Sequence, residues 1–263
     1  MLTRFLTGNG RIDPTTDGWR LHLGPATGYS DAQLDDTQGR WRRGLLHRPP
    51  VRLTLEARAS SAEPGGTLGF GFWNDPFPAW GVQAGAKRLL PASPQALWFF
   101  YASPPSDIPF SADGPGSGWT AARFQGPALP GSVIAAMGAA GLAGMSSVRW
   151  RIPLLKMYRR WFAGSQSPLL GGLDSWHAYR IDWKKGSAYF SVDDRVVLET
   201  NTAPAGPLGL VIWIDNQWAA LSETAGLRFG VLPSLKEACA LFGSTPGGSA
   251  IWRTKRPKLR SQR

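Results

Sequence analysis

The sequence predicts an all-β protein, an antiparallel β-sandwich with one short helical insertion, from three observations. First, 32 glycines and 22 prolines are spread over 263 residues, and frequent turn formers favour short strands over long helices. Second, the segment 51–58 alternates apolar and polar side chains, which is typical of a strand with one solvent-exposed face. Third, the segments 95–102 and 207–215 are almost wholly apolar, as expected for strands buried on both faces.

The first half of the chain is expected to supply the first strands of a single domain that covers residues 1–242. Residues 1–48 are polar and rich in turns, and we expect the carboxylate pair Asp35–Asp36 among them to be solvated rather than to bind Ca²⁺ or act in chemistry. Strands are expected at 51–60, 67–75 and 95–103. Glycines alternate with Leu68, Phe70 and Phe72 in the second of these, which indicates close approach of another backbone or a ligand.

Residues 114–173 are expected to form an insertion in this β framework. The run 151–162 predicts a short helix with Pro153 near its first turn. One side of that helix is basic, with Lys156, Arg159 and Arg160, and the other is apolar, with Leu154, Leu155, Tyr158, Trp161 and Phe162. A basic amphipathic helix of this kind either packs its apolar face on the β core or lies in a membrane interface.

Further strands are predicted at 177–183, 187–193, 195–200 and 207–215. The first two are joined by a tight turn in which Gly186 can take a positive φ. Ser234 and Glu237 have capping-box spacing, which predicts a short helix over 233–242 with Cys239 in its apolar, core-facing side. Residues 243–263 are expected to be a basic C-terminal tail without fixed structure.

Positive charge is concentrated in two segments of the chain. The net charge is +11, and the segments 114–173 and 253–263 each hold basic residues and no acidic residue. We expect 148–162 and 253–263 to contact an anionic membrane surface or a protein complex. Nucleic acid ranks last as a partner, because the core lacks a basic stripe with interleaved aromatic residues. The expected surface-binding residues are Lys156, Arg159, Arg160, Lys255, Arg256 and Lys258.

One cysteine and three histidines exclude a disulfide framework and a cysteine-rich metal site. No metal or cofactor is therefore expected. The first residues lack the apolar core of a signal peptide, and no continuous apolar block of about 20 residues could span a membrane. We expect a cytoplasmic protein, with peripheral attachment to a membrane as an option.

A family resemblance is carried by two parts of the chain. WHAYRIDW (176–183) followed by AYFSVDDRVV (188–197) resembles the W-H-x-Y-x-x-x-W … F-x-V-D-G signature of family 16 glycoside hydrolases, the laminarinase and lichenase relatives. LTLEARAS (53–60) followed by GTLGFGFWND (66–75) resembles that family's F-E-A-R … G-x-x-P-A-F-W strands. The resemblance covers residues 50–105 and 174–232, and it implies a concanavalin A-like jelly roll.

The same resemblance argues against the family's reaction. The family's catalytic strand carries E-x-D-x-x-E, whose alternate carboxylates point into a cleft. The strand in that order here is 95–103, QALWFFYAS, which holds aromatic residues and no carboxylate. Glycoside hydrolysis of the family type is therefore not expected, although other chemistry in the same cleft stays open.

Two hypotheses of function remain. In the first, a non-hydrolytic binding or assembly protein holds a glycan or an amphipathic small molecule in an aromatic-lined cleft, or the cleft is plugged by its own side chains. The expected cleft residues are Trp73, Asn74, Trp98, Tyr101, Trp213, Asn216 and Trp218.

In the second hypothesis, an enzyme uses relocated carboxylates on a glycan or a hydrophobic metabolite, as a hydrolase, lyase or isomerase. The candidate catalytic residues are Asp75, Asp215 and Glu56. Asp75 and Asp215 must then converge within about 5–10 Å across one pocket. If they do not, both acids cap turns, and Glu56 pairs with a neighbouring arginine.

Overall fold

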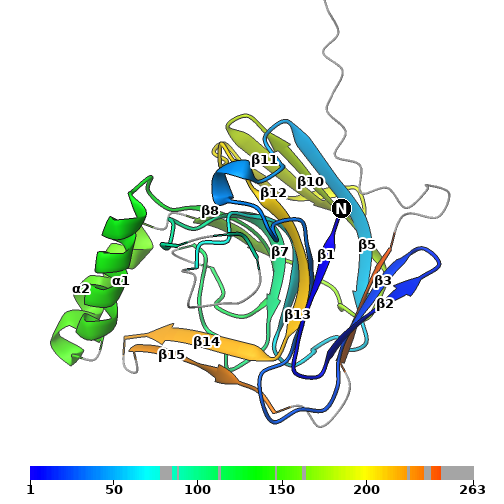
Figure 1. Cartoon of the computed structure of the whole chain (residues 1–263), viewed down its shortest axis with the longest axis horizontal. Coiled ribbons are helices and arrows are strands. Elements are labelled where there is room, and N and C mark those ends of the chain that lie inside the picture. The colour runs from blue at the N-terminus through cyan, green and yellow to red at the C-terminus, as the bar shows by residue number, and fades with distance from the viewer. Residues whose placement is uncertain are drawn as a thin grey trace, which may run out of the picture.

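Two seven-stranded antiparallel sheets pack against each other and confirm the predicted β-sandwich (Figure 1). This computed structural model describes residues 1–77, 85–87, 89–111, 114–145, 147–161, 164–223, 226–233 and 238–243. Within these ranges, no helix is long and apolar enough to cross a membrane.

The first sheet contains the strands that are buried on both faces. Its order is β1(Thr3–Thr7), β4(Asp31–Asp35), β13(Gly209–Asp215), β6(Thr67–Trp73), β7(Gln95–Ala102), β8(Gly118–Gln125) and β9(Gly164–Pro168). The predictions for β7 and β13 are confirmed, since nearly every side chain of both strands is buried.

The second sheet has one face in the core and one toward solvent. Its order is β12(Arg195–Thr200), β11(Ser187–Val192), β10(His177–Lys184), β5(Val51–Ala59), β16(Ala238–Gly243), β3(Gly18–Leu23) and β2(Gly10–Thr15). In β5 the apolar alternate residues are buried and the polar ones mostly exposed, as predicted. Gly186 has a φ of 78° in the β10–β11 turn, also as predicted.

Aromatic side chains from both sheets form the core between them. Phe70 and Phe99 of the first sheet lie within 5.1 Å and 5.0 Å, respectively, of the Tyr179 ring of the second. Phe99 also contacts Phe190 edge-on. The alternation of side chains along each strand delivers these rings to one side of the sheet, so the other side of the first sheet is left for a separate cluster.

The helical insertion is narrower than the predicted 114–173. Residues 118–125 and 164–168 belong to the first sheet as β8 and β9. The two strands pair with each other, from Phe124 opposite Gly164 to Thr120 opposite Pro168. Between these strands lie α1(Gly131–Met145), which was not predicted, and α2(Val148–Trp161). Pro153 is in the interior of α2 rather than its first turn. The two helices form a helical hairpin (131–161) that stands to one side of the sheets (Figure 1).

A separate β-hairpin, β14(Gln217–Ser222) and β15(Gly226–Val231), leaves the sandwich after β13. It extends toward the helical hairpin in Figure 1, and α1 contacts β15. A short 3₁₀ helix at Arg42–Gly44 completes the described elements. The helical hairpin thus rests on the β-hairpin rather than on the core between the sheets, where one of the two predictions placed the apolar face of α2.

The predicted helix over 233–242 is wrong for its second half, since residues 238–243 form β16 between β3 and β5. Cys239 consequently lies in a strand, half-buried, opposite His22. The unpaired backbone groups of β3 and β5 require partners, and this requirement outweighs the local capping signal. Ser234 and Glu237 lie outside the described residues, as do residues 244–263 of the predicted tail.

Candidate functional site

The face of the first sheet that points away from the second sheet, here called the outer face, carries most of the candidate residues. Along β13 the side chains of Val211 and Trp213 lie on this face, whereas Ile212 and Ile214 enter the core. Along β7, Trp98 lies on the outer face and Tyr101 in the core. The prediction that Tyr101 lines a cleft is therefore wrong, because its position in the strand has the opposite parity.

Six aromatic rings fill the middle of the outer face and form the aromatic cluster: Trp73, Trp98, Phe100, Phe110, Phe124 and Trp213. The ring centre of Trp98 lies 5.2 Å from that of Phe124 and 5.6 Å from that of Trp213. Trp98 and Trp213 are only 9% and 8% exposed. Stacking of a sugar on their faces is thus blocked by the protein's own side chains.

Two features of the chain hold this cluster in place. Phe110 comes from the β7–β8 loop, where its backbone N–H donates to Oε1 of Gln166 at 2.5 Å. Gly69 of β6 leaves room for Trp213, because a Cβ at Gly69 would lie 2.6 Å from Cη2 of that indole. The predicted close approach to the glycines of β6 is confirmed, and the approaching groups include the protein's own tryptophans.

Two indole N–H groups of the cluster have no acceptor within the described part of the chain. Nε1 of Trp73 and Nε1 of Trp98 are buried and have no hydrogen-bond partner among the described residues. By contrast, Nε1 of Trp213 donates to Oγ1 of Thr67 at 3.0 Å. An unmade hydrogen bond at a buried donor costs about 1–3 kcal/mol.

The predicted polar cleft residues have structural roles. Asn74 donates to the carbonyl of Ser93 and accepts from the N–H of Gln95. Asn216 is 3% exposed and accepts from the N–H of Ser30. It also donates to the carbonyls of Gly28 and Leu232. These bonds leave both amides engaged with the backbone.

Trp218 does not join the aromatic cluster through any described ring contact. It lies half-buried in β14, where the guanidinium of Arg228 in β15 stands 5.8 Å from its ring.

The three predicted catalytic carboxylates do not converge. Thr67 pairs with Asp215 and Trp73 with Gly209, so Asp215 and Asp75 lie at opposite ends of β6. Seven residues of strand separate these ends by about 20 Å, which contradicts the shared pocket. Asp75 has a φ of 48° and accepts from the N–H of Ala86, in agreement with a turn. Glu56 lies in β5 of the other sheet, on its solvent side.

Asp215 instead has a carboxylate neighbour that sequence reasoning missed. Asp31 of β4 pairs directly with Asp215 of β13, and opposed side chains on adjacent strands have Cβ atoms about 4.5–5.5 Å apart. Asp31 is 4% exposed, and its Oδ1 has no hydrogen-bond partner among the described residues. The hydroxyl of Tyr29 is hydrogen-bonded to this carboxyl and to the side chain of Gln217.

Burial raises the pKa of both acids of this pair. Burial raises the pKa of Asp215 to about 6, although Thr67 and the N–H of Gln217 both donate to its Oδ1. Burial, and next the charge of Asp215, raise the pKa of Asp31 well above its ordinary value. Two such carboxyls can share a proton. The alternation D-x-Q-x-D in residues 31–35 was the available signal, since it places three polar side chains on one face.

The prediction that Asp35 and Asp36 are solvated is wrong. Asp35 is fully buried and accepts from the backbone N–H groups of Thr37 and Gln38. The carboxylate of Asp36 lies 2.5 Å from Nε2 of His47 and accepts from the N–H of Leu210. Asp35 therefore fixes the turn after β4, and Asp36 connects that turn to the start of β13.

An apolar cavity of about 390 Å³ lies between the helical hairpin and the β-hairpin. The helix α1 contributes Ile134, Met137, Gly138, Gly141, Leu142 and Met145, which recur at the spacing of one helix face. The remaining lining residues are Leu154, Leu155 and Met157 of α2, Leu221 and Leu227 of the β-hairpin, and Ser93, Ile108, Pro127 and Leu129. Among these described residues, Ser93 alone has a polar side chain.

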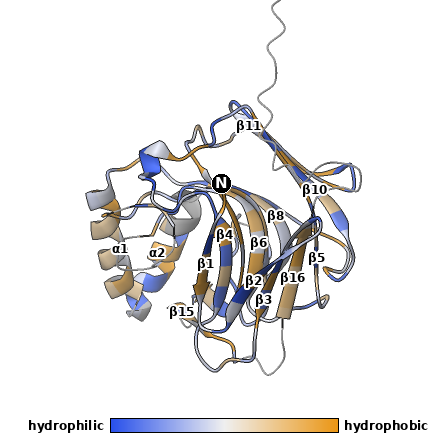
Figure 2. Ribbon diagram, turned by 45° about the vertical axis from the view of Figure 1, so that its right-hand side comes forward, coloured by the Kyte–Doolittle hydropathy of each residue, from blue (hydrophilic) through white to orange (hydrophobic). Residues whose placement is uncertain are grey.

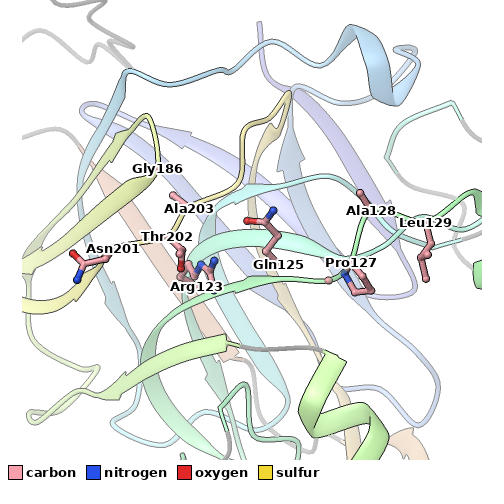
Figure 3. A pocket seen from close by; sticks show the side chains of 10 residues that line it. Arg123, Gln125, Pro127, Ala128, Leu129, Gly186, Asn201, Thr202 and Ala203 are labelled. Atoms are coloured by element: carbon pink, nitrogen blue, oxygen red, sulfur yellow. The ribbon is translucent and has the colours of Figure 1, made fainter.

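Two other depressions lie at the edges of the sandwich. The larger, about 770 Å³, is open and lined by Arg123, Gln125, Asn201, Thr202 and neighbouring loop residues (Figure 3). Burial lowers the pKa of Arg123. The smaller, about 510 Å³, contains His177, whose Nδ1 lies 2.6 Å from the carboxylate of Asp193. Among the described residues, no group of three or more His, Cys, Asp or Glu side chains is arranged to hold a metal.

The predicted surface-binding residues are only partly described. Lys156 is exposed on α2. Arg159 and Arg160 belong to the same helix, but their side chains fall outside the described part of the structure. Lys255, Arg256 and Lys258 lie outside the described residues.

No protein-family model matches the sequence, and no curated protein matches it. Among solved structures, the chain is similar to a GlcNAcα1-4Gal-releasing endo-β-galactosidase from Clostridium perfringens, with 11% identity and a TM-score of 0.43. That match covers 89% of this chain and 52% of the enzyme, so the chain spans about half its length.

Two further similarities have comparable values. A legume lectin-like domain from Entamoeba histolytica has 9% identity and a TM-score of 0.46, over 93% of this chain and 90% of that one. A non-specific endo-β-1,3(4)-glucanase from family GH16 has 12% identity and a TM-score of 0.37, over 80% of this chain and 59% of that one. These three neighbours are two glycosidases and a lectin-like domain, and the similarity to them is one of fold.

Proposed function

We propose that this protein binds an apolar or amphipathic small molecule without hydrolysing it, and that the ligand occupies the cavity between the helical hairpin and the β-hairpin. The observation that carries this proposal is the lining of the cavity, which is apolar in all its described side chains except Ser93. Its volume of about 390 Å³ falls within the range of about 300–1,000 Å³ typical of small-molecule sites. Three methionines in the lining can adapt to ligands of different shape.

A glycan is less well supported as the ligand. Sugar binding requires hydrogen-bonding groups around the ring as well as an aromatic platform. The aromatic cluster is covered, and the amides of Asn74 and Asn216 are engaged with the backbone. A hydrocarbon chain or a fused ring system would bind favourably in the cavity, because its apolar surface would be removed from water.

The enzyme hypothesis is also less well supported. Asp75 and Asp215 lie at opposite ends of β6. In the Asp31–Asp215 pair, the side chain of Asp31 is buried, and its carboxyl is hydrogen-bonded to Tyr29. A general acid must come within hydrogen-bond reach of its substrate, and a carboxyl that is 4% exposed does not offer this access.

The proposal is tested by titrating the protein with N-phenyl-1-naphthylamine, an uncharged apolar fluorescent probe. We expect saturable binding of one probe per chain. A Cβ added at Gly141 meets no atom within 4 Å, so Gly141→Leu should extend into the cavity without disturbing α1. Because each methylene that loses its burial costs about 0.8 kcal/mol, we expect an affinity at least about tenfold lower.

Ala140→Leu is the matched control, since it adds the same side chain to an exposed position of the same helix. It should bind the probe as the unmodified protein does. The proposal is wrong if the probe does not bind saturably, or if Gly141→Leu binds it unchanged. Saturable binding of a neutral oligosaccharide in place of the probe would assign the ligand to the glycan class.

A further inference from the structure

The helical hairpin exposes five large apolar side chains. Leu142 is 61% exposed, Trp150 57%, Ile152 43%, Val133 40% and Met157 39%. None of the residues of α1 is fully buried, and α1 contacts β15 of the β-hairpin. A surface of this kind on one projecting element indicates a partner that accepts apolar groups.

Positive charge accompanies this apolar surface. Arg149 and Lys156 are exposed on α2, next to Trp150, Ile152 and Met157. The whole segment 114–173 contains no acidic residue. Figure 2 shows hydrophilic and hydrophobic segments side by side on the helical hairpin. The partner must therefore present negatively charged groups and an apolar phase close to each other.

We propose that the helical hairpin docks on the surface of an anionic lipid bilayer, with Arg149 and Lys156 among the headgroups and Trp150 and Met157, which share one face of α2, below them. Nucleic acid would meet the cations but would leave the aliphatic side chains without a partner. The interface of a bilayer accepts both, and tryptophan is favoured there because one end of its ring is polar.

The length of the helices fits docking rather than spanning. With a rise of about 1.5 Å per residue, α1 and α2 are each about 21–23 Å long, whereas the hydrocarbon core of a bilayer is about 30 Å thick. Gly144 brings the helices close together, because a Cβ there would lie 2.6 Å from Cδ1 of Leu154. Nε of Arg151 donates to the carbonyl of Met145 at the end of α1, which fixes the turn between the helices.

Docking and ligand binding are separate claims about neighbouring surfaces. Leu142 and Met157 line the cavity and are also exposed, so the mouth of the cavity faces the same side as the docking surface. Vesicle binding nevertheless requires no ligand, and the failure of either proposal leaves the other standing.

The test is co-sedimentation of the full chain with vesicles. Vesicles of phosphatidylcholine containing about one third phosphatidylglycerol should bind the protein, and added salt should weaken this binding. Pure phosphatidylcholine vesicles should bind it far less. The variant R149E/K156E should lower the partition coefficient by about thirty-fold or more, since each lost cation weakens partitioning about fivefold and each new anion adds repulsion.

The matched control for charge is R11E/K185E, which reverses two exposed cations on the sandwich. It should bind vesicles as the unmodified chain does. For the apolar part, Trp150→Ser should weaken binding about tenfold or more. Its control is Trp176→Ser, a tryptophan 47% exposed beside Arg58 on the sandwich.

Three outcomes would overturn the proposal. The first is binding that R149E/K156E leaves unchanged, which would assign the charge effect to another segment such as 253–263. The second is equal binding by Trp150→Ser and the unmodified chain, which would exclude insertion of the hairpin. The third is the absence of binding to either type of vesicle, together with binding of a double-stranded oligonucleotide that depends on Arg149 and Lys156.

Discussion

At the scale of single residues, the Asp31–Asp215 pair is the least expected feature of the molecule. Each acid would be ordinary by itself, because a short acid at the end of a strand commonly caps a turn. Their direct pairing across β4 and β13 places two carboxyls together under partial or complete burial. The protein must keep at least one of them protonated or accept their repulsion.

This pair predicts how stability depends on pH. Burial raises the pKa of Asp215 from 3.8 to about 6 in the folded chain, so the folded state holds a proton that the unfolded state has released between these values. The contribution of Asp215 to the free energy of unfolding should therefore fall as pH rises from about 4 to about 6, by at most about 3 kcal/mol. Asp215→Asn should remove this contribution and leave the one that burial of Asp31 causes, because the amide at position 215 does not ionise and keeps an oxygen acceptor for Thr67 and Gln217.

The measurement is urea unfolding of both proteins at several pH values. Asp174→Asn, at an exposed position, is the control and should follow the pH profile of the unmodified chain. Parallel profiles for Asp215→Asn and the unmodified chain would contradict the assignment.

At the scale of elements, β6 shows how glycine and tryptophan positions depend on each other. The alternation of glycine with Leu68, Phe70 and Phe72 sends these large side chains into the core and leaves the middle of the outer face of β6 without side chains. Trp213 of β13 fills that space over Gly69. The pattern of one strand thus decides where a tryptophan of the next strand can lie.

Gly69→Ala tests this dependence. The new Cβ would lie 2.4 Å from the carbonyl oxygen of Phe99 and 2.6 Å from Cη2 of Trp213, both closer than real Cβ contacts. We expect the free energy of unfolding to fall by about 1–3 kcal/mol, the usual cost of overpacking. Denaturant unfolding measures this, and Gly65→Ala, where a Cβ meets nothing within 4 Å, should change stability by less than about 0.5 kcal/mol. A stable Gly69→Ala protein would show that Trp213 can move away freely.

Element positions were easier to predict from the sequence than their faces and partners. Strands β5, β7, β10, β11 and β13 follow from local alternation or continuous apolar runs, which act over a few residues. The strand β16 does not, because its conformation is imposed by two neighbours that are distant in sequence. The helix α1 lacks charged residues and a polar face, so its sequence has no amphipathic periodicity from which a helix could be predicted.

At the scale of the whole molecule, the helical hairpin is a separable addition to the sandwich. Phe124 of β8 and Gly164 of β9 are register partners, so the chain leaves the sheet and returns to it at adjacent points. A loop of about five residues can close an antiparallel pair of this kind. Both proposed binding activities depend on the helical hairpin, whereas the core between the sheets contains none of its residues.

Replacing residues 127–162 by Asn-Gly should therefore give a sandwich that still unfolds cooperatively. Near-ultraviolet circular dichroism should retain the signal of packed aromatic rings, while the helical signal in the far ultraviolet disappears. The shortened chain should bind neither N-phenyl-1-naphthylamine nor anionic vesicles. Loss of cooperative unfolding would show that the hairpin is part of the fold, and retained probe binding would move the ligand site elsewhere.

The sequence by itself determined the β-sandwich, the position of most strands and the segregation of positive charge, because these depend on composition and on patterns within single segments. The tertiary structure alone decided that Trp98 and Trp213 close the outer face while Tyr101 enters the core. It also decided that Asp215 meets Asp31 rather than Asp75. The physical reason is that side-chain parity and strand register set these contacts, and register is fixed only when distant strands pair.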